Sequence, residues 1–162
     1  MIRTLYRLIY IFKKNLTNRI CFGELHKFMI KKIKYLPLLT LLASCQSAEK
    51  VKLEQYYIGG KEIFEKNCAN CHQKDGKGLQ NLYPPIAGSD YLDDKSKVIT
   101  AIKYGLVGEL KVNGKTYNQP MPANTHLQNL DIAEVVTYIY AEWRNETAVT
   151  SVEEVEKALK NK

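Results

Sequence analysis

The sequence lacks several features that would place it in common protein classes. Its 162 residues contain no run of 18 apolar residues, which excludes a membrane-spanning helix. There is no internal repeat and no low-complexity tract, and cysteine, histidine and methionine are scarce at four, three and three residues. With 45% hydrophobic and 25% charged residues, the composition is that of a globular protein and not of a disordered or fibrous one. The length suits one domain of ordinary size.

Outside its N-terminal part, the chain has no excess of positive charge. Residues 1–44 hold nine basic residues and one acidic residue, whereas residues 45–162 hold 15 basic and 16 acidic residues. The formal net charge of +7 therefore originates in the N-terminal block, and the remainder has a net charge of −1. This asymmetry indicates a targeting segment, and we expect no nucleic-acid partner.

The segment that begins at Met29 has the layout of a secretory signal. A lysine-rich stretch precedes a short apolar stretch, which is too short to span a bilayer. It ends in Leu-Ala-Ser-Cys at residues 42–45, which resembles the lipobox of bacterial lipoproteins, where the cysteine becomes lipidated. The alternative is a buried helix that ends in cysteine. We predict a signal peptide over 29–44 and an exported protein anchored to the membrane on its periplasmic side through Cys45.

The rest of the chain divides around one folded domain. Residues 1–28 would make the leader unusually long, so we expect Met29 to be the true start; the alternative is an extended leader that is removed with the rest. Residues 45–55 are predicted to be the lipidated N-terminus and a polar tether. The domain is predicted over 56–146, followed by a tail over 147–162 that contains a short helix.

One motif carries cofactor chemistry. Residues 68–72 read Cys-Ala-Asn-Cys-His, the C-x-x-C-H pattern that attaches c-type haem through two thiols and places an imidazole on the iron. A structural disulfide does not require the histidine. A zinc site needs four ligands, and beyond its carboxylates the mature chain offers only His126 in addition to the motif. A thioredoxin-like site needs a βαβ context, which is missing. The motif predicts one covalent haem c on Cys68, Cys71 and His72.

Because methionine and histidine are scarce, few residues are candidates for the second axial ligand of the iron. After Cys45 the chain contains one methionine, Met121, and one histidine outside the motif, His126. Met121 lies between Pro120 and Pro122, which stiffen the loop because their φ angles are fixed. We predict Met121 as the ligand, with His126 or an open site as alternatives. A core-filling methionine fits the flanking prolines less well.

Periodicity predicts a helical scaffold with one hairpin. Apolar spacing predicts three helices, at about 60–70, 96–106 and 129–144. Alternation around Asn113-Gly114 predicts a hairpin over 110–117, and residues 73–88 are predicted to be loop. A capping-box pattern at Ser151 predicts a weaker terminal helix.

The first and last of the three main helices are expected to pack together. Gly59 and Gly60 would allow another helix to approach closely, and Phe64, Tyr138 and Trp143 are interpreted as aromatic core packing that holds the cofactor site shut. No direct chemical role is predicted for these aromatic residues.

Over residues 55–146 these features resemble the monohaem class I cytochromes c in their lipoprotein-anchored bacterial form. The resemblance implies an all-α fold of three to four helices around one covalently bound haem, with a small hairpin before the loop that carries Met121. In that family a P-x-L-x-G segment supplies a proline carbonyl to the proximal imidazole. Residues 84–88 read Pro-Pro-Ile-Ala-Gly, which points to Pro84, with Pro85 as the alternative.

These features predict a one-electron carrier. Ligation by His72 and Met121 raises the reduction potential and leaves no open position for a substrate. We expect electrons to arrive from a quinol-oxidising complex and to leave to a terminal oxidase or reductase. The alternatives are a peroxidase-like or ligand-binding haem protein with a labile Met121, and a fixed electron-transfer subunit of a larger complex. Lys74 and Lys77 are interpreted as a solvated loop in preference to a docking patch.

Overall fold

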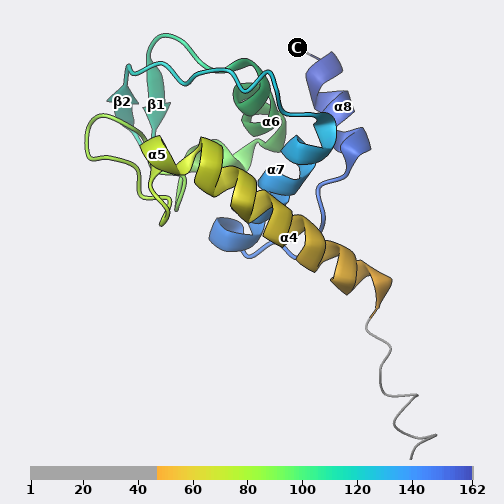
Figure 1. The fold of residues 1–162 in the computed structure, drawn as a ribbon. Coiled ribbons are helices and arrows are strands. Elements are labelled where there is room, and N and C mark those ends of the chain that lie inside the picture. The colour runs from red at the N-terminus through yellow and green to blue at the C-terminus, as the bar shows by residue number, and fades with distance from the viewer. Residues whose placement is uncertain (1–46, 162) are drawn as a thin grey trace, which may run out of the picture. The chain divides into compact units, whose positions relative to one another are not determined.

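The computed structural model describes residues 47–161, which form a helical domain with one hairpin (Figure 1). The predicted leader and Cys45 lie outside the described residues. In chain order the elements are α4 (Ala48–Asn67), α5 (Ala69–His72), the 3-10 helix η2 (Asp90–Asp93), α6 (Lys95–Tyr104), β1 (Leu110–Val112), β2 (Lys115–Tyr117), α7 (Asn129–Arg144) and α8 (Val152–Lys160). None of the helices over residues 47–161 has the combination of length and apolar character that a membrane span requires.

The predicted fold class is confirmed. Within residues 47–161 there are five α-helices instead of the expected three to four, because the haem motif forms the separate turn α5 and the C-terminal tail folds as α8. The hairpin is antiparallel, pairs Leu110 with Tyr117, and turns at Asn113 and Gly114 with φ angles of 53° and 76°. Two successive positive φ angles are typical of the two-residue turn that an Asn-Gly pair favours.

Helix α4 is longer than the sequence predicts. It begins at Ala48, because the Ser47 side chain caps it by accepting a hydrogen bond from the Lys50 amide at 3.4 Å. Most of the stretch expected to be a polar tether is therefore helical. The helix also continues through Gly59 and Gly60, although glycine lowers helix stability by roughly 1 kcal/mol relative to alanine. Tertiary packing outweighs that propensity at this point of the chain.

The backbones of α4 and α7 are in direct contact at Gly60. A Cβ atom at this position would lie 2.6 Å from the carbonyl carbon of Glu134 and 2.8 Å from the Cβ of Tyr138. Real Cβ atoms essentially never come so close to another heavy atom. At Gly59 the nearest atoms instead belong to the flexible end of the Glu134 side chain. The prediction of a close helix approach at this pair is therefore confirmed, and Gly60 is the residue that requires it.

An aromatic cluster continues the contact between α4 and α7 toward the haem motif. Phe64 is fully buried, and its ring centroid lies 5.4 Å from that of Tyr138 and 5.2 Å from that of Trp143. Tyr57 packs edge-on against Tyr138 at 5.1 Å, and its hydroxyl donates to Glu142 at 2.6 Å. This hydrogen bond, together with burial, raises the pKa of Tyr57 to about 12. The predicted aromatic packing is confirmed, and it fixes the end of α4 from which the haem motif starts.

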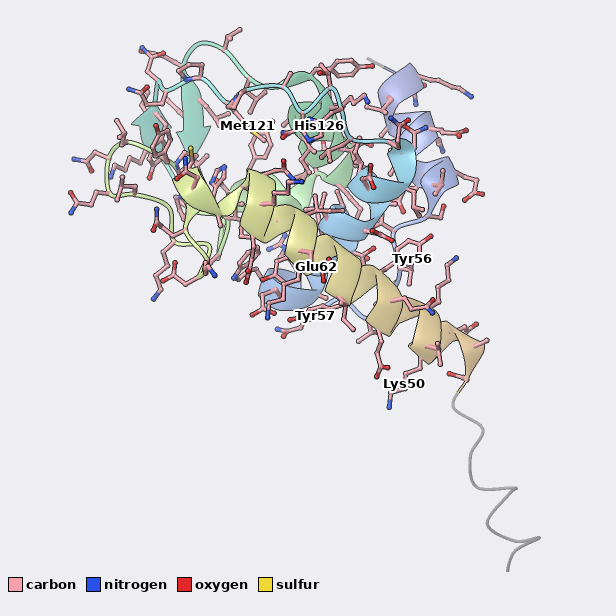
Figure 2. All side chains as sticks on the ribbon, in the orientation of Figure 1. Lys50, Tyr56, Tyr57, Glu62, Met121 and His126 are labelled. Atoms are coloured by element: carbon pink, nitrogen blue, oxygen red, sulfur yellow. The ribbon has the colours of Figure 1, made fainter. Side chains whose placement is uncertain are left out.

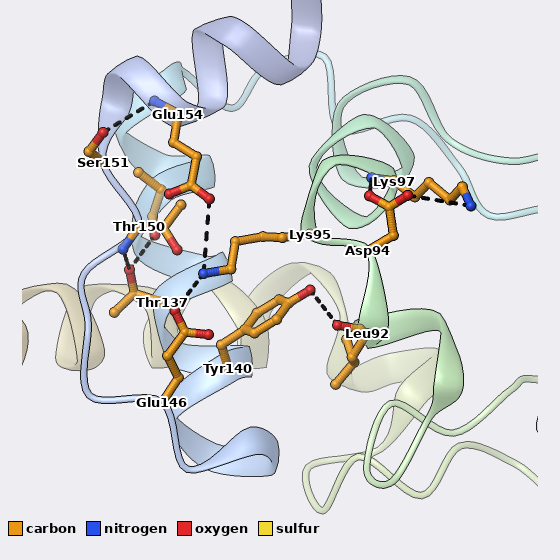
Figure 3. A network of polar contacts seen from close by, with 11 residues as sticks. Leu92, Asp94, Lys95, Lys97, Thr137, Tyr140, Glu146, Thr150, Ser151 and Glu154 are labelled. Atoms are coloured by element: carbon orange, nitrogen blue, oxygen red, sulfur yellow. Dashed lines mark hydrogen bonds and ion pairs between the residues drawn. The ribbon is translucent and has the colours of Figure 1, made fainter.

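A polar network joins the other side of α7 to η2, α6 and α8 (Figure 3). The Tyr140 hydroxyl donates to the Leu92 carbonyl at 2.8 Å, and the Lys95 ammonium lies 4.5 Å above the Tyr140 ring. Lys95 also pairs with Glu146 at 2.6 Å and lies 4.0 Å from Glu154 of α8. The C-terminal tail is therefore part of the domain. The sequence predicted this tail only as a segment with a weak helix.

Substitution of Gly60 by alanine is expected to lower the free energy of unfolding by about 2 kcal/mol or more, because the new methyl group overlaps the Glu134 backbone. Gly59→Ala is the matched control. It should be close to neutral, because the Glu134 carboxylate can move and alanine favours the helix. Denaturant unfolding of both variants measures the difference, and equal stabilities for the two would contradict the backbone contact.

Candidate haem-binding site

A large cavity brings together the residues that the sequence predicts to hold the cofactor. Cys68, Cys71, His72, Pro84 and Met121 all line it. It contains about 1130 Å³ of space free of atoms, part of which is open to solvent. Among the described residues that line it there is no lysine, arginine, aspartate or glutamate, and its walls are largely aliphatic side chains and tyrosines. Such a cavity fits a bulky, mostly apolar cofactor with a few polar attachment points.

The proximal side of the cavity is one helical turn at the end of α4. The amide of His72 donates to the Cys68 carbonyl at 3.0 Å, and that of Cys71 donates to the same carbonyl at 3.2 Å. Residues three apart on a helix lie on the same face, so Cys68 and Cys71 are presented together. Both are free thiols, Cys68 buried and Cys71 half-buried. The disulfide alternative is therefore absent from this part of the structure.

The His72 ring is oriented by a single hydrogen bond. Its Nδ1 lies 3.0 Å from the Pro84 carbonyl oxygen, which selects Pro84 over Pro85 as the partner that the resemblance implies. A carbonyl can only accept, so Nδ1 carries the proton and Nε2 keeps a lone pair for a metal. Burial lowers the pKa of His72, and the bond to Pro84 opposes this effect in part. The imidazole is therefore kept neutral, which is the form that binds iron.

The loop between His72 and Pro84 is held in place by its own backbone. The amide of Gly78 donates to the His72 carbonyl at 2.9 Å, and the amide of Ile86 donates to the Gly76 carbonyl at 2.7 Å. Gly78 has a φ of 69°, and a Cβ there would lie 2.6 Å from the Pro84 carbonyl oxygen. Glycine is therefore required at this position for Pro84 to approach His72.

The Met121 segment is anchored to the end of α6. Leu106 and Met121 form an isolated antiparallel bridge, with amide-to-carbonyl distances of 3.0 and 2.9 Å. The Asn124 amide donates to the Ile102 carbonyl at 3.1 Å, so the segment is tied at a second point. The sequence predicted stiffness from the flanking prolines but missed this pairing. The sequence signal that could have indicated this pairing was Gly105, because its φ of 73° allows the chain to turn beside Met121.

The remaining candidate residues lie elsewhere. His126 is exposed and is not among the residues that line the cavity, whereas Met121 is half-buried within it (Figure 2). Lys74 is paired with Glu65 at 3.4 Å and Lys77 with Asp75 at 3.2 Å. Both pairs are well exposed and each lysine is balanced by a carboxylate, so the two lysines form no patch of net positive charge, in agreement with a solvated loop.

These features define a c-type haem protein with a single attachment motif, and comparison with known proteins agrees. Residues 58–142 match the family model "Cytochrome c". The chain is 34% identical over 89 residues to cytochrome c-552 of Thermus thermophilus, which covers 52% of this chain and 67% of that protein. It is 32% identical over 90 residues to the cytochrome c subunit of the quinone alcohol dehydrogenase of Gluconobacter oxydans, covering 53% of this chain and 18% of the relative.

The chain therefore belongs to the cytochrome c family, as a monohaem class I cytochrome c. Proteins of this family carry covalently attached haem c, and the residues of the cavity fit that group. The apolar cavity is lined by two free thiols on one helical face, a neutral imidazole and a thioether. Within residues 47–161 no cluster of three or more histidine, cysteine or acidic residues could hold another metal ion, so the zinc alternative has no support there.

Substitution of Gly105 by alanine is expected to loosen the Met121 segment. A Cβ at Gly105 would lie 2.8 Å from the Ala123 amide nitrogen and 3.0 Å from the Pro122 carbonyl carbon. Amide hydrogen exchange at Leu106 and Met121 should rise roughly tenfold or more, because the bridge opens at lower free energy.

Gly114→Ala serves as the control for Gly105→Ala. It places alanine at a similar φ of 76°, but nothing lies within 4 Å of the new Cβ. It should therefore show only the backbone strain of about 1 kcal/mol, with exchange at Leu106 and Met121 unchanged. Equal exchange in the two variants would show that the end of α6 does not hold the Met121 segment.

Proposed function

We propose that this cytochrome c is a one-electron carrier whose iron is ligated by His72 and Met121. The observation that carries the proposal is that both side chains line one cavity, and that hydrogen bonds hold the His72 ring and the backbone of Met121. His72 is oriented by the Pro84 carbonyl, and Met121 is paired with Leu106. When bound, haem supplies a reversible one-electron couple between ferric and ferrous iron.

The residues that line the cavity would suit rapid electron exchange at a bound haem iron. A neutral imidazole and an uncharged thioether favour the ferrous state more than two anionic ligands would, which raises the reduction potential. The apolar walls of the cavity limit the access of water. Backbone hydrogen bonds in the two loops limit the movement of His72 and Met121. If His72 and Met121 both bound the haem iron, no coordination position would be left for a substrate. This argues for electron transfer and against a peroxidase-like activity.

The direction of electron flow and the location are part of the same proposal. A carrier with a raised potential would take electrons from a quinol-oxidising complex and pass them to a terminal oxidase or reductase. The signal over 29–44 and the cysteine at its end support export and a lipid anchor on the periplasmic side. Anchoring would confine the carrier to the surface on which such complexes operate.

A second candidate function has one specific observation in its favour. The likeness to cytochrome c subunits of quinone alcohol dehydrogenases suggests a fixed electron-transfer subunit of a larger complex. The chain covers only 18% and 20% of those subunits. Co-purification of a stoichiometric dehydrogenase partner from detergent-solubilised membranes would favour this second function over the mobile carrier.

The Met121→Ala variant tests the axial ligand. The ferric protein should lose the weak sulfur-to-iron absorption band, its reduction potential should fall, and its ferrous form should bind carbon monoxide readily, because one axial position opens. His126→Ala is the matched control and should change none of the three properties, since His126 lies outside the cavity. A Met121→Ala protein that keeps the band would exclude Met121, and rapid carbon monoxide binding by the wild type would favour the ligand-binding alternative.

The Cys45→Ser variant tests the anchor. Wild-type protein should sediment with membranes and resist extraction by high salt, whereas Cys45→Ser should be released, because the acyl chains attach at this residue. Cys21→Ser is the control, since it precedes the expected start at Met29 and should not affect membrane association. Salt-resistant membrane association of Cys45→Ser would contradict the lipid anchor.

A further inference from the structure

Very little chain separates the proposed lipid anchor from the folded domain. Only Gln46 and Ser47 lie between Cys45 and the first residue of α4, Ala48. Ser47 is itself the N-cap of the helix, and the Lys50 and Val51 amides donate to its carbonyl at 3.0 and 3.2 Å. The sequence predicted a lipidated N-terminus and a short polar tether over 45–55, but residues 48–55 are helical. The anchor would therefore act on a helix end almost directly.

Helix α4 is a single stiff element from that end to the haem motif. It runs without interruption from Ala48 to Asn67, and the Cys68 amide still donates to the Phe64 carbonyl at 2.9 Å. Its two consecutive glycines could bend freely in isolation, but Gly60 is buried against the Glu134 backbone. Twenty helical residues span about 30 Å at a rise of 1.5 Å per residue.

The N-terminal turns of α4 extend beyond the rest of the domain. Figure 1 shows this end of the helix projecting away from α6, α7 and α8, and residues 47–52 are all exposed. Lys50 points outward from this end in Figure 2. An isolated helix end gains nothing from packing. The cavity lies at the other end of the same helix, where Cys68 and His72 line it.

The exposed surface of these turns is not suited to lying flat on a bilayer. Helices that lie in the interface combine a continuous apolar face with a basic polar face. Here the first two turns carry both signs of charge, at Glu49, Lys50, Lys52 and Glu54. The large exposed apolar side chains of α4 are Val51, at 38% exposure, and Ile58, at 59%, and the polar Gln55 separates them on that face. The exposed turns therefore lack the continuous apolar face that an interfacial helix needs.

We propose that α4 is a rigid spacer that stands on the membrane surface and holds the haem cavity about 30 Å from the anchored end. This inference rests on the lipid anchor proposed above. The spacer fixes the height at which the cavity is presented, so a redox partner must expose its own electron-transfer site at that height. A flexible tether would instead let the cavity sample all heights within reach.

Two insertions of equal length between Ser47 and Ala48 distinguish a rigid spacer from a flexible tether. One adds seven residues of an alanine-, glutamate- and lysine-rich helical sequence, and the other adds seven glycine and serine residues that end in serine, so that Ala48 keeps a capping residue. Each lipidated holoprotein is placed in phosphatidylcholine vesicles that carry a headgroup fluorophore. The haem quenches this fluorophore by energy transfer, and the quenching reports the distance between the haem and the bilayer surface.

The rigid spacer predicts opposite results for the two insertions. The helical insertion should raise the haem by about 10 Å and reduce the quenching, whereas the glycine-serine insertion should let the domain approach the bilayer and increase it. Equal quenching for wild type and both insertions, or the same change in both, would overturn the spacer while leaving the anchor intact. If the wild-type chain does not partition into the vesicles, the anchor is wrong and the spacer falls with it.

Discussion

The backbone contact between Gly60 and Glu134 determines how closely α4 approaches α7, and the position of the cofactor site depends on that approach. Phe64 can pack against Tyr138 and Trp143 only because the two helices are in van der Waals contact one turn earlier. Cys68 follows Phe64 by one helical turn and is buried as a consequence. The attachment motif is thus placed by a helix crossing that contains none of the residues with a chemical role.

From that fixed turn, the two loops around the cavity are held by local hydrogen bonds and need little support from the core. The first loop brings Pro84 to His72, and positive φ angles at Gly76 and Gly78 allow it to turn twice within a short span. The second loop runs beside the end of α6 and holds Met121 against Leu106. The two segments that carry the proposed ligands are therefore held by hydrogen bonds within the protein itself, as the proposed electron carrier would need.

The sequence predicted most of this arrangement where the signal was local. The bounds of α7, the Asn113-Gly114 hairpin and the haem motif follow from periodicity, turn chemistry and a fixed spacing. Most of what sequence reasoning missed depends on contacts between distant segments. One missed feature is local, since the early start of α4 depends on a serine cap within a polar stretch. The pairing of Leu106 with Met121 joins two separate segments, and Gly105 was the one sequence signal for it. The integration of α8 depends on Val155 and Ala158, which are buried in the core, and on Lys95, which meets two glutamates and an aromatic ring only in the folded chain.

X-ray absorption spectroscopy of the iron in the purified holoprotein tests the central claim most directly. Six ligands are expected in both oxidation states, five nitrogens from the porphyrin and His72 and one sulfur from Met121, because the cavity offers one imidazole and one thioether. A coordination shell of six nitrogens, or of five ligands with no sulfur, would contradict that claim.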